Sequence, residues 1–134
     1  MRIIGSILFI LAFSLMPTWI SAEEIEIEGP VEIVEKFLIA SQNGEVEVMK
    51  TLIAGPYYER RKELLEDNKA YPDFLRKYFE EVFVRIVEVE NQEINGSVIV
   101  VLENEVNNGQ IINTKLILRK DQTGAWKIFD ELLE

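Results

Sequence analysis

The spacing of the apolar residues changes once along the chain, near residue 82, and this change limits the folds that the chain can adopt. Before it, apolar residues recur three and four positions apart, as on one face of a helix. After it, they alternate with polar residues and are rich in valine and isoleucine, as in strands with one buried face. Helices followed by neighbouring strands predict an α+β domain, in which the helices pack on one face of an antiparallel sheet.

The helical part divides at glycine and proline residues. Pro30 fits the first position of a helix, where its missing N–H costs nothing, and we expect this helix to end at the Gln-Asn-Gly sequence 42–44. A second helix is expected over residues 46–53, before Gly55 and Pro56. The largely charged segment 57–68 predicts either a polar helix or an irregular lid.

A further helix is expected over residues 74–82, with Asp73 as its N-cap. Its apolar residues recur at helical spacing and form a stripe, which predicts the helix. The stripe consists of Phe74, Leu75, Tyr78, Phe79 and Val82.

About four strands are expected after this helix, with turns at residues 91–96, 107–109 and 121–124. The Asn-Asn-Gly sequence 107–109 predicts a hairpin. In the last strand, alternation places Trp126 and Ile128 on one side. The third-last strand is apolar on both faces, so Ile99 and Val101 would point to water unless another sheet covered them.

The N-terminal residues have the order of a secretory signal peptide: one positive charge at Arg2, an apolar run, and small residues up to Ala22. The apolar run is short for a membrane span. We therefore expect residues 1–22 to be removed and the protein to be periplasmic or secreted, with an uncleaved anchor as the alternative. Residues 23–29 would form an acidic leader, and residues 30–134 a single α+β domain.

The composition excludes several kinds of chemistry. The chain has no cysteine and no histidine, so it has no disulfide framework, no catalytic thiol and neither of two common metal ligands. We expect no metal and no cofactor. Its formal net charge is −10, and removing Arg2 with the signal peptide would make it −11. Such a charge repels nucleic acids and anionic membranes, so neither is an expected partner.

Two longer stretches carry a resemblance to a known family. "VEKFLIASQNGEVEVMKTLI" resembles the opening helices of the nuclear-transport-factor-2-like (cystatin-like) superfamily, and "FVRIVEVENQEINGSVIVVLENEV" with "GQIINTKLILRKDQTGAWKIFD" resembles its closing strands. The final Trp-Lys-Ile sequence 126–128 is similar to the last strand of its secreted, uncharacterised bacterial branch. The resemblance covers nearly all of residues 30–131 and implies a curved, cone-shaped sheet that wraps around the helices and encloses a cavity.

The same resemblance leaves the activity open, because the superfamily includes ketosteroid isomerase, scytalone dehydratase and many binding domains without chemistry. The dehydratase branch relies on histidine, which this chain lacks. The isomerase branch uses a tyrosine with two pocket acids. No such set can be matched here residue by residue.

Three tyrosines and an aspartate lie near the expected lid of the cone, at Tyr57, Tyr58, Tyr71 and Asp73. A tyrosine could donate a hydrogen bond to a ligand carbonyl while a carboxylate moves a proton. The interpretation we favour is structural, with tyrosines covering the edge of the core and Asp73 capping a helix.

Asp130, which follows Trp126 in the last strand, could project a carboxylate into the cavity, where burial would raise its pKa. The favoured interpretation places it at the end of the strand in solvent. The basic residues could bind an anion, but with many neighbouring glutamates they favour a solvated face of i, i+4 pairs. They are Arg60, Arg61, Lys62, Arg76 and Lys77.

The Asn-Gly-Ser sequence 95–97 matches an N-glycosylation site and also suits a hairpin turn; we interpret it as a turn.

These observations predict an exported, non-catalytic binding or protein-interaction module, whose apolar pocket is poor in groups that transfer protons. An isomerase- or hydrolase-like enzyme with a buried carboxylate and tyrosine is one alternative. A homodimer formed through the sheet face is another. The expected partners are a small apolar ligand or a protein, and the candidate ligand-binding residues are Tyr57, Tyr58, Tyr71, Asp73, Trp126 and Asp130.

Overall fold

A computed structural model describes residues 28–92 and 95–133, without the side chains of Gln92 and Leu133. The expected signal peptide and residues 23–27 of the acidic leader lie outside the described residues. None of the helices in the described part is long and apolar enough to cross a membrane.

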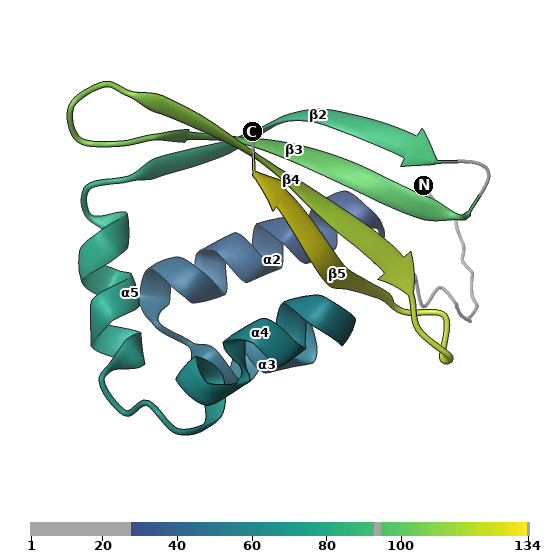
Figure 1. The fold of residues 1–134 in the computed structure, drawn as a ribbon, viewed down its shortest axis with the longest axis horizontal. Coiled ribbons are helices and arrows are strands. Elements are labelled where there is room, and N and C mark those ends of the chain that lie inside the picture. The colour runs from purple at the N-terminus through teal and green to yellow at the C-terminus, as the bar shows by residue number, and fades with distance from the viewer. Residues whose placement is uncertain (1–27, 93–94, 134) are drawn as a thin grey trace, which may run out of the picture.

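Four helices precede the sheet in the described part of the chain (Figure 1). They are α2 (Pro30–Asn43), α3 (Val46–Thr51), α4 (Gly55–Glu66) and α5 (Tyr71–Phe79). The charged segment after Gly55 is therefore a helix and not an irregular lid.

The start of α5 differs from the expectation. The N-cap is Ala70, whose N–H donates to Oδ1 of Asn68 at 2.9 Å, so an Asn-based turn begins the helix. Pro72 occupies one of the first two helical positions, and Asp73 lies within the first turn. The prediction that Asp73 is the N-cap is wrong because the helix begins two residues before it.

Four antiparallel strands follow in the order β2-β3-β4-β5, joined as a simple meander. They are β2 (Phe83–Gln92), β3 (Ser97–Glu105), β4 (Ile111–Lys120) and β5 (Trp126–Leu133). The predicted hairpin at residues 107–109 is confirmed, since the N–H of Val106 donates to the carbonyl of Gln110 at 2.9 Å. The α+β class and the helices-first order are confirmed.

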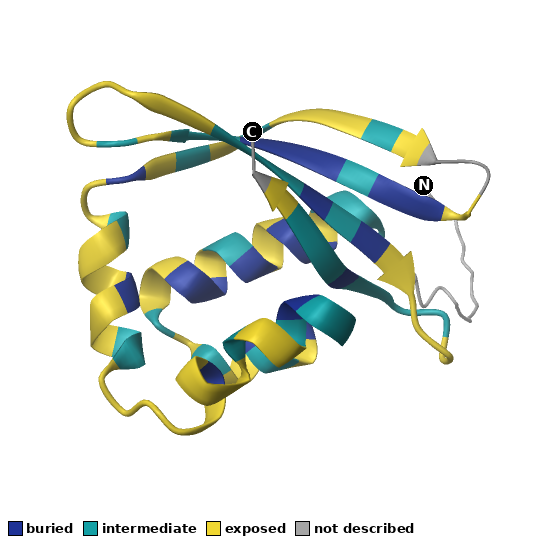
Figure 2. Cartoon of the chain, in the orientation of Figure 1, coloured by how far each residue is buried: buried dark blue, intermediate teal, exposed yellow. Residues whose placement is uncertain are grey.

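The helices lie on one face of the curved sheet, and the core fills the space between the two layers (Figures 1 and 2). Inward residues of the two central strands oppose one another, such as Val100 and Leu116. The most deeply buried large side chains are Leu116, Leu118, Ile128, Val34 and Val100.

Helix α5 leaves part of its apolar stripe exposed. It packs against α2 at one end of the sheet and not across the sheet (Figure 1). Within the helix Leu75 is buried, whereas Phe74 is 58% exposed and Tyr78 45% exposed. The stripe of Phe74, Leu75, Tyr78 and Phe79 therefore lies on a helix, as predicted, but two of its aromatic residues face solvent.

The edge of β5 is partly covered by the segment between α3 and α4. The N–H of Ala54 donates to the carbonyl of Ile128 at 2.9 Å, and the N–H of Ile128 donates to the carbonyl of Leu52 at 2.9 Å. This short parallel bridge fixes the start of α4 against the last strand.

A β-bulge at Phe129 changes which side chains of β5 face the helices. Ile128 opposes Leu118, but Asp130 opposes Ile117, so Phe129 is an extra residue without a partner in the register. A bulge of this kind reverses the alternation beyond it. Asp130 consequently lies on the outer face, and Glu131 faces the helices opposite Leu116.

The predictions for Asp130 are corrected accordingly. It is not at the end of the strand, because β5 continues to Leu133, and it does not project into the space between the layers.

Candidate functional site

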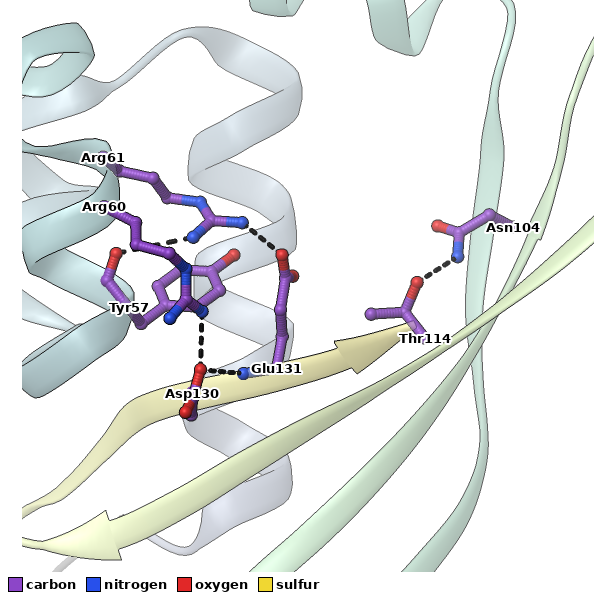
Figure 3. A network of polar contacts seen from close by, with 7 residues as sticks. All are labelled: Tyr57, Arg60, Arg61, Asn104, Thr114, Asp130 and Glu131. Carbon is purple, nitrogen blue, oxygen red and sulfur yellow. Dashed lines mark hydrogen bonds and ion pairs between the residues drawn. The ribbon is translucent and has the colours of Figure 1, made fainter. Parts of the chain in front are cut away.

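A partly enclosed cavity of about 270 Å³ lies between α2, α4, α5 and the inner face of the sheet. Most of its wall is apolar and comes from the core, for example from Phe37, Met49 and Leu116. One side is polar because Tyr57, Arg61 and Glu131 lie together there (Figure 3). The other lining residues with polar side-chain groups are Ser41, Tyr71, Tyr78, Asn104 and Thr114.

An ion pair joins α4 to β5 at this polar side (Figure 3). Nη2 of Arg61 donates to Oε2 of Glu131 at 2.5 Å, and each side chain is 21% exposed. Glu131 reaches the cavity because of the bulge at Phe129. The cavity, which the sequence predicts to be poor in groups that transfer protons, thus has one carboxylate in its lining among the described residues.

Tyr57 lies beneath this pair and is only 5% exposed. The guanidinium carbon of Arg61 is 3.7 Å from the centre of its ring, a cation–π contact, and the ring of Phe37 meets it edge-on at 5.8 Å. Burial raises the pKa of the Tyr57 hydroxyl, although the nearby Arg61 acts in the opposite direction. The hydroxyl is therefore held in its neutral, hydrogen-bonding form.

Neither the Tyr57 hydroxyl nor the Tyr71 hydroxyl has a hydrogen-bond partner among the described residues, although both side chains line the cavity. Burial also raises the pKa of Tyr71. Tyr57 is buried and Tyr71 is half-buried. A buried hydroxyl without a partner, such as that of Tyr57, is uncommon in folded proteins, because losing water without replacement costs about 1–3 kcal/mol. These two groups can donate to a molecule in the cavity.

The sheet contributes a second polar group to the cavity. Nδ2 of Asn104 donates to Oγ1 of Thr114 at 3.1 Å and to the carbonyl of Ile112 at 2.9 Å (Figure 3). This bond fixes the Asn104 amide, and Thr114 retains its own hydroxyl proton as a donor.

Four aromatic side chains of α5 border the cavity, of which Phe74 and Tyr78 are exposed to solvent and Tyr71 and Phe79 are half-buried. The ring of Phe74 lies 6.2 Å from that of Tyr71 and 6.0 Å from that of Tyr78, and both pairs are stacked. Phe79 meets Tyr78 edge-on at 5.1 Å. All four rings line the cavity.

The structure brings two of the six predicted ligand-binding residues, Tyr57 and Tyr71, to the cavity. Tyr58 lies elsewhere on α4 and donates its hydroxyl to Glu66 at 2.7 Å. Asp73 is exposed and pairs with Arg76 at 2.5 Å. These two do not line the cavity.

The two predicted residues of β5 do not line the cavity either. Trp126 begins the strand and has the ammonium of Lys120 at 5.4 Å from its ring. Asp130 pairs with Arg60 at 2.5 Å. The hydrogen bonds from Arg60 and from the Glu131 N–H lower the pKa of Asp130, the reverse of the shift expected for a carboxyl in an apolar cavity.

The basic residues of α4 also differ from the expectation. Arg60 and Arg61 pair across to β5 and not with glutamates of their own helix. On α5, Arg76 donates to the carbonyl of Asn43 at 2.9 Å and so caps the end of α2.

Sequence reasoning missed Arg61 and Glu131 as a pair, together with Asn104 and Thr114. The acid and the arginine are 70 positions apart, and regular alternation from Ile128 would place Asp130 inside and Glu131 outside. In the described part of the chain, no group of three or more acidic residues could hold a metal ion.

No protein-family model matches the sequence, and no curated protein matches it. A solved structure of a ketosteroid isomerase-like protein from Erwinia carotovora atroseptica SCRI1043 is similar to this chain, with a TM-score of 0.45 and 16% sequence identity. The match covers 81% of this chain and 93% of that one. The helices and the curved four-stranded sheet described above have the architecture expected of the nuclear-transport-factor-2-like superfamily.

Proposed function

We propose that the protein is a non-catalytic domain that binds a small molecule in the cavity between the helices and the sheet. The observation that carries this proposal is the buried Tyr57 hydroxyl, which borders the cavity without a partner among the described residues. Ligand sites are typically concave and mostly apolar, with a few converging polar groups, and this cavity has that composition.

The test is to fill the cavity. Replacing Thr114 by phenylalanine would occupy space on the sheet wall, and Gln122→Phe, at an exposed turn, is the matched control. A panel of small polar ring compounds is screened by thermal shift and calorimetry. We expect Thr114→Phe to abolish the binding of every hit and Gln122→Phe to retain it. Hits that bind both variants equally, or no hits at all, would reject the proposal.

A second candidate is an isomerase-like enzyme in which Glu131 moves a proton and Tyr57 hydrogen-bonds a carbonyl oxygen. Both residues lie on the same side of the cavity, which favours this candidate. Against it, one carboxylate oxygen of Glu131 is already bound by Arg61. Deuterium incorporation from D2O into cyclohexanone, followed by NMR, tests it. If the unaltered protein does not exchange deuterium into cyclohexanone faster than Glu131→Gln does, this candidate is rejected.

We also propose that the chain is exported, with residues 1–22 removed. The order of charged, apolar and small residues at the N-terminus supports this. The mass of the protein recovered from the producing cell and its medium is the measurement. A protein that begins at Glu23 is expected, and a protein that retains residues 1–22 would contradict cleavage.

Pairing of two copies through the outer sheet face is a further proposal. On that face Phe83 is 64% exposed and Leu132 50% exposed, which supports it. Val101, expected to point to water, is buried between its cross-strand neighbours Glu88 and Lys115. Sedimentation equilibrium should show a dimer that Leu132→Lys dissociates. A monomer at all concentrations would reject this proposal.

A further inference from the structure

We infer that the cavity selects uncharged molecules the size of one substituted six-membered ring, and discriminates against anions and cations of the same shape. This inference rests on the proposed binding function and assigns it a ligand class.

The first step concerns charge. Arg61 and Glu131 are the charged side chains that line the cavity in the described part of the chain, and they neutralise each other at 2.5 Å. Both are about four-fifths buried. A charged ligand would have to separate them, or remain without a counter-charge beside side chains that are about four-fifths buried. Either outcome is costly because a buried charge needs a partner. A neutral ligand leaves the pair intact.

The second step concerns hydrogen bonds. The hydroxyls of Tyr57 and Tyr71 lack partners among the described residues and can donate to an acceptor on the ligand. Oδ1 of Asn104 faces the same space, because its Nδ2 is held by Thr114 and the Ile112 carbonyl, and it can accept from a donor on the ligand. A neutral amide or hydroxyl supplies an acceptor and a donor together.

The third step concerns size and shape. The cavity of about 270 Å³ lies near the lower end of the range of small-molecule pockets, about 300–1,000 Å³, so it suits a ligand smaller than a typical drug. A ring with one small polar substituent is such a ligand. The aromatic rings of Phe37, Tyr57 and Phe79 border this volume and suit a planar ring by edge and face contacts.

Benzamide, benzoate and benzamidinium provide a direct test, because they share one skeleton and the same number of non-hydrogen atoms but differ in charge. Isothermal titration of the full folded domain at pH 7 measures their Kd values. We expect benzamide to bind at least about tenfold more tightly than either ion.

Two variants sharpen the test. Glu131→Gln leaves Arg61 without its acid, so the preference should move to benzoate. Arg61→Met leaves the Glu131 carboxylate without its cationic partner, so the preference should move to benzamidinium. The matched controls are Asp130→Asn and Arg60→Met, which alter the neighbouring pair on the outer face. They should keep the preference for benzamide.

The outcomes separate the inference from the proposed function. If benzoate or benzamidinium binds the unaltered protein most tightly, or all three bind equally, the inference is wrong while the binding function stands. If no probe and no other ring compound binds, both are wrong. Because the comparison within the unaltered protein decides the matter, a variant that fails to fold does not weaken the test.

Discussion

At the scale of single residues, the two adjacent arginines of α4 bind the two adjacent acids of β5 in different surroundings. Arg60 and Asp130 form a pair with side chains 49% and 34% exposed, and the Arg61 and Glu131 side chains are each 21% exposed. Water screens the first pair more than the second, so removing one partner of the second pair leaves a charge that is solvated less well.

Glu131→Gln should therefore lower the free energy of unfolding by about 1–3 kcal/mol, because it leaves the Arg61 guanidinium without a charged partner in a partly buried site. Asp130→Asn should cost distinctly less. Urea denaturation of both variants at pH 7 is the measurement. Equal losses would show that burial does not separate the two pairs.

The bulge at Phe129 explains why the site could be predicted only in part. Tyr57 and Tyr71 could be selected because tyrosines flanking a predicted lid are typical of a cavity rim. Glu131 could not, since a single extra residue in β5 exchanges the positions of Asp130 and Glu131, and no local sequence signal marks it. Its partner Arg61 could not be singled out either, because nothing in the sequence distinguishes it from the other basic residues of the same charged helix.

At the scale of elements, α4 depends on a close contact at its first residue. Gly55 has a φ of +59°, and a Cβ placed on it would lie 2.4 Å from Cε1 of Phe129. The helix thus begins directly against the bulge of β5.

Gly55→Ala should destabilise the protein through backbone strain of about 1–2 kcal/mol and a further loss of about 1–3 kcal/mol from displacing the Phe129 ring. Gly109→Ala is the matched control, because its φ is +85° and no atom lies within 4 Å of the added Cβ. Gly109→Ala should lower the free energy of unfolding only by the cost of the backbone strain. Midpoints of urea unfolding compare the two, and equal midpoints would exclude the contact with Phe129.

Helix α5 offers a second comparison at this scale. Leu75 is 6% exposed and Phe74 is 58% exposed, although both belong to the apolar stripe that predicts this helix. We expect Leu75→Ala to cost about 2–5 kcal/mol and Phe74→Ala to cost much less. Thermal or urea unfolding measures both changes, and a larger loss for Phe74→Ala would contradict the orientation of this helix.

The elements themselves could mostly be predicted, because the change from helical spacing to alternation survives in the fold. The sequence leaves open whether the α4 segment is a helix or an irregular lid, because only Tyr57 and Leu65 are buried within it, and two apolar positions are too few to mark a helical face. Besides the core contacts of Tyr57 and Leu65 and the backbone bridge at its start, ion pairs with a strand far along the chain attach this helix. Such long-range pairs leave no periodicity in the sequence.

At the scale of the whole molecule, stability should change little between about pH 6 and pH 8, because the chain has no histidine to titrate there. It should fall below about pH 4. Hydrogen bonds lower the pKa values of Glu66, Asp121 and Asp130, chiefly those from Tyr58, Thr123 and Arg60 respectively, so the stability they contribute is present above the unfolded pKa values and is lost as the pH falls through the folded ones.

Stability should also decline above about pH 10, where tyrosine ionises in the unfolded chain. Burial raises the pKa of Tyr57, so its contribution is complete below that pH and is lost as the pH rises. Urea midpoints from pH 2.5 to 11, in 0.5 M salt to screen the net negative charge, measure both limits. A transition near pH 6.5 would contradict this profile.

The bridge between Ile53 and Ile128 has a consequence for synthesis of the protein. The helices leave the ribosome long before β5, yet the start of α4 is held by Ile128 and the cavity is completed by Glu131. During translation the apolar faces of the nascent helices therefore stay exposed until β5 has been synthesised. We expect a chaperone to bind this chain most tightly in that interval.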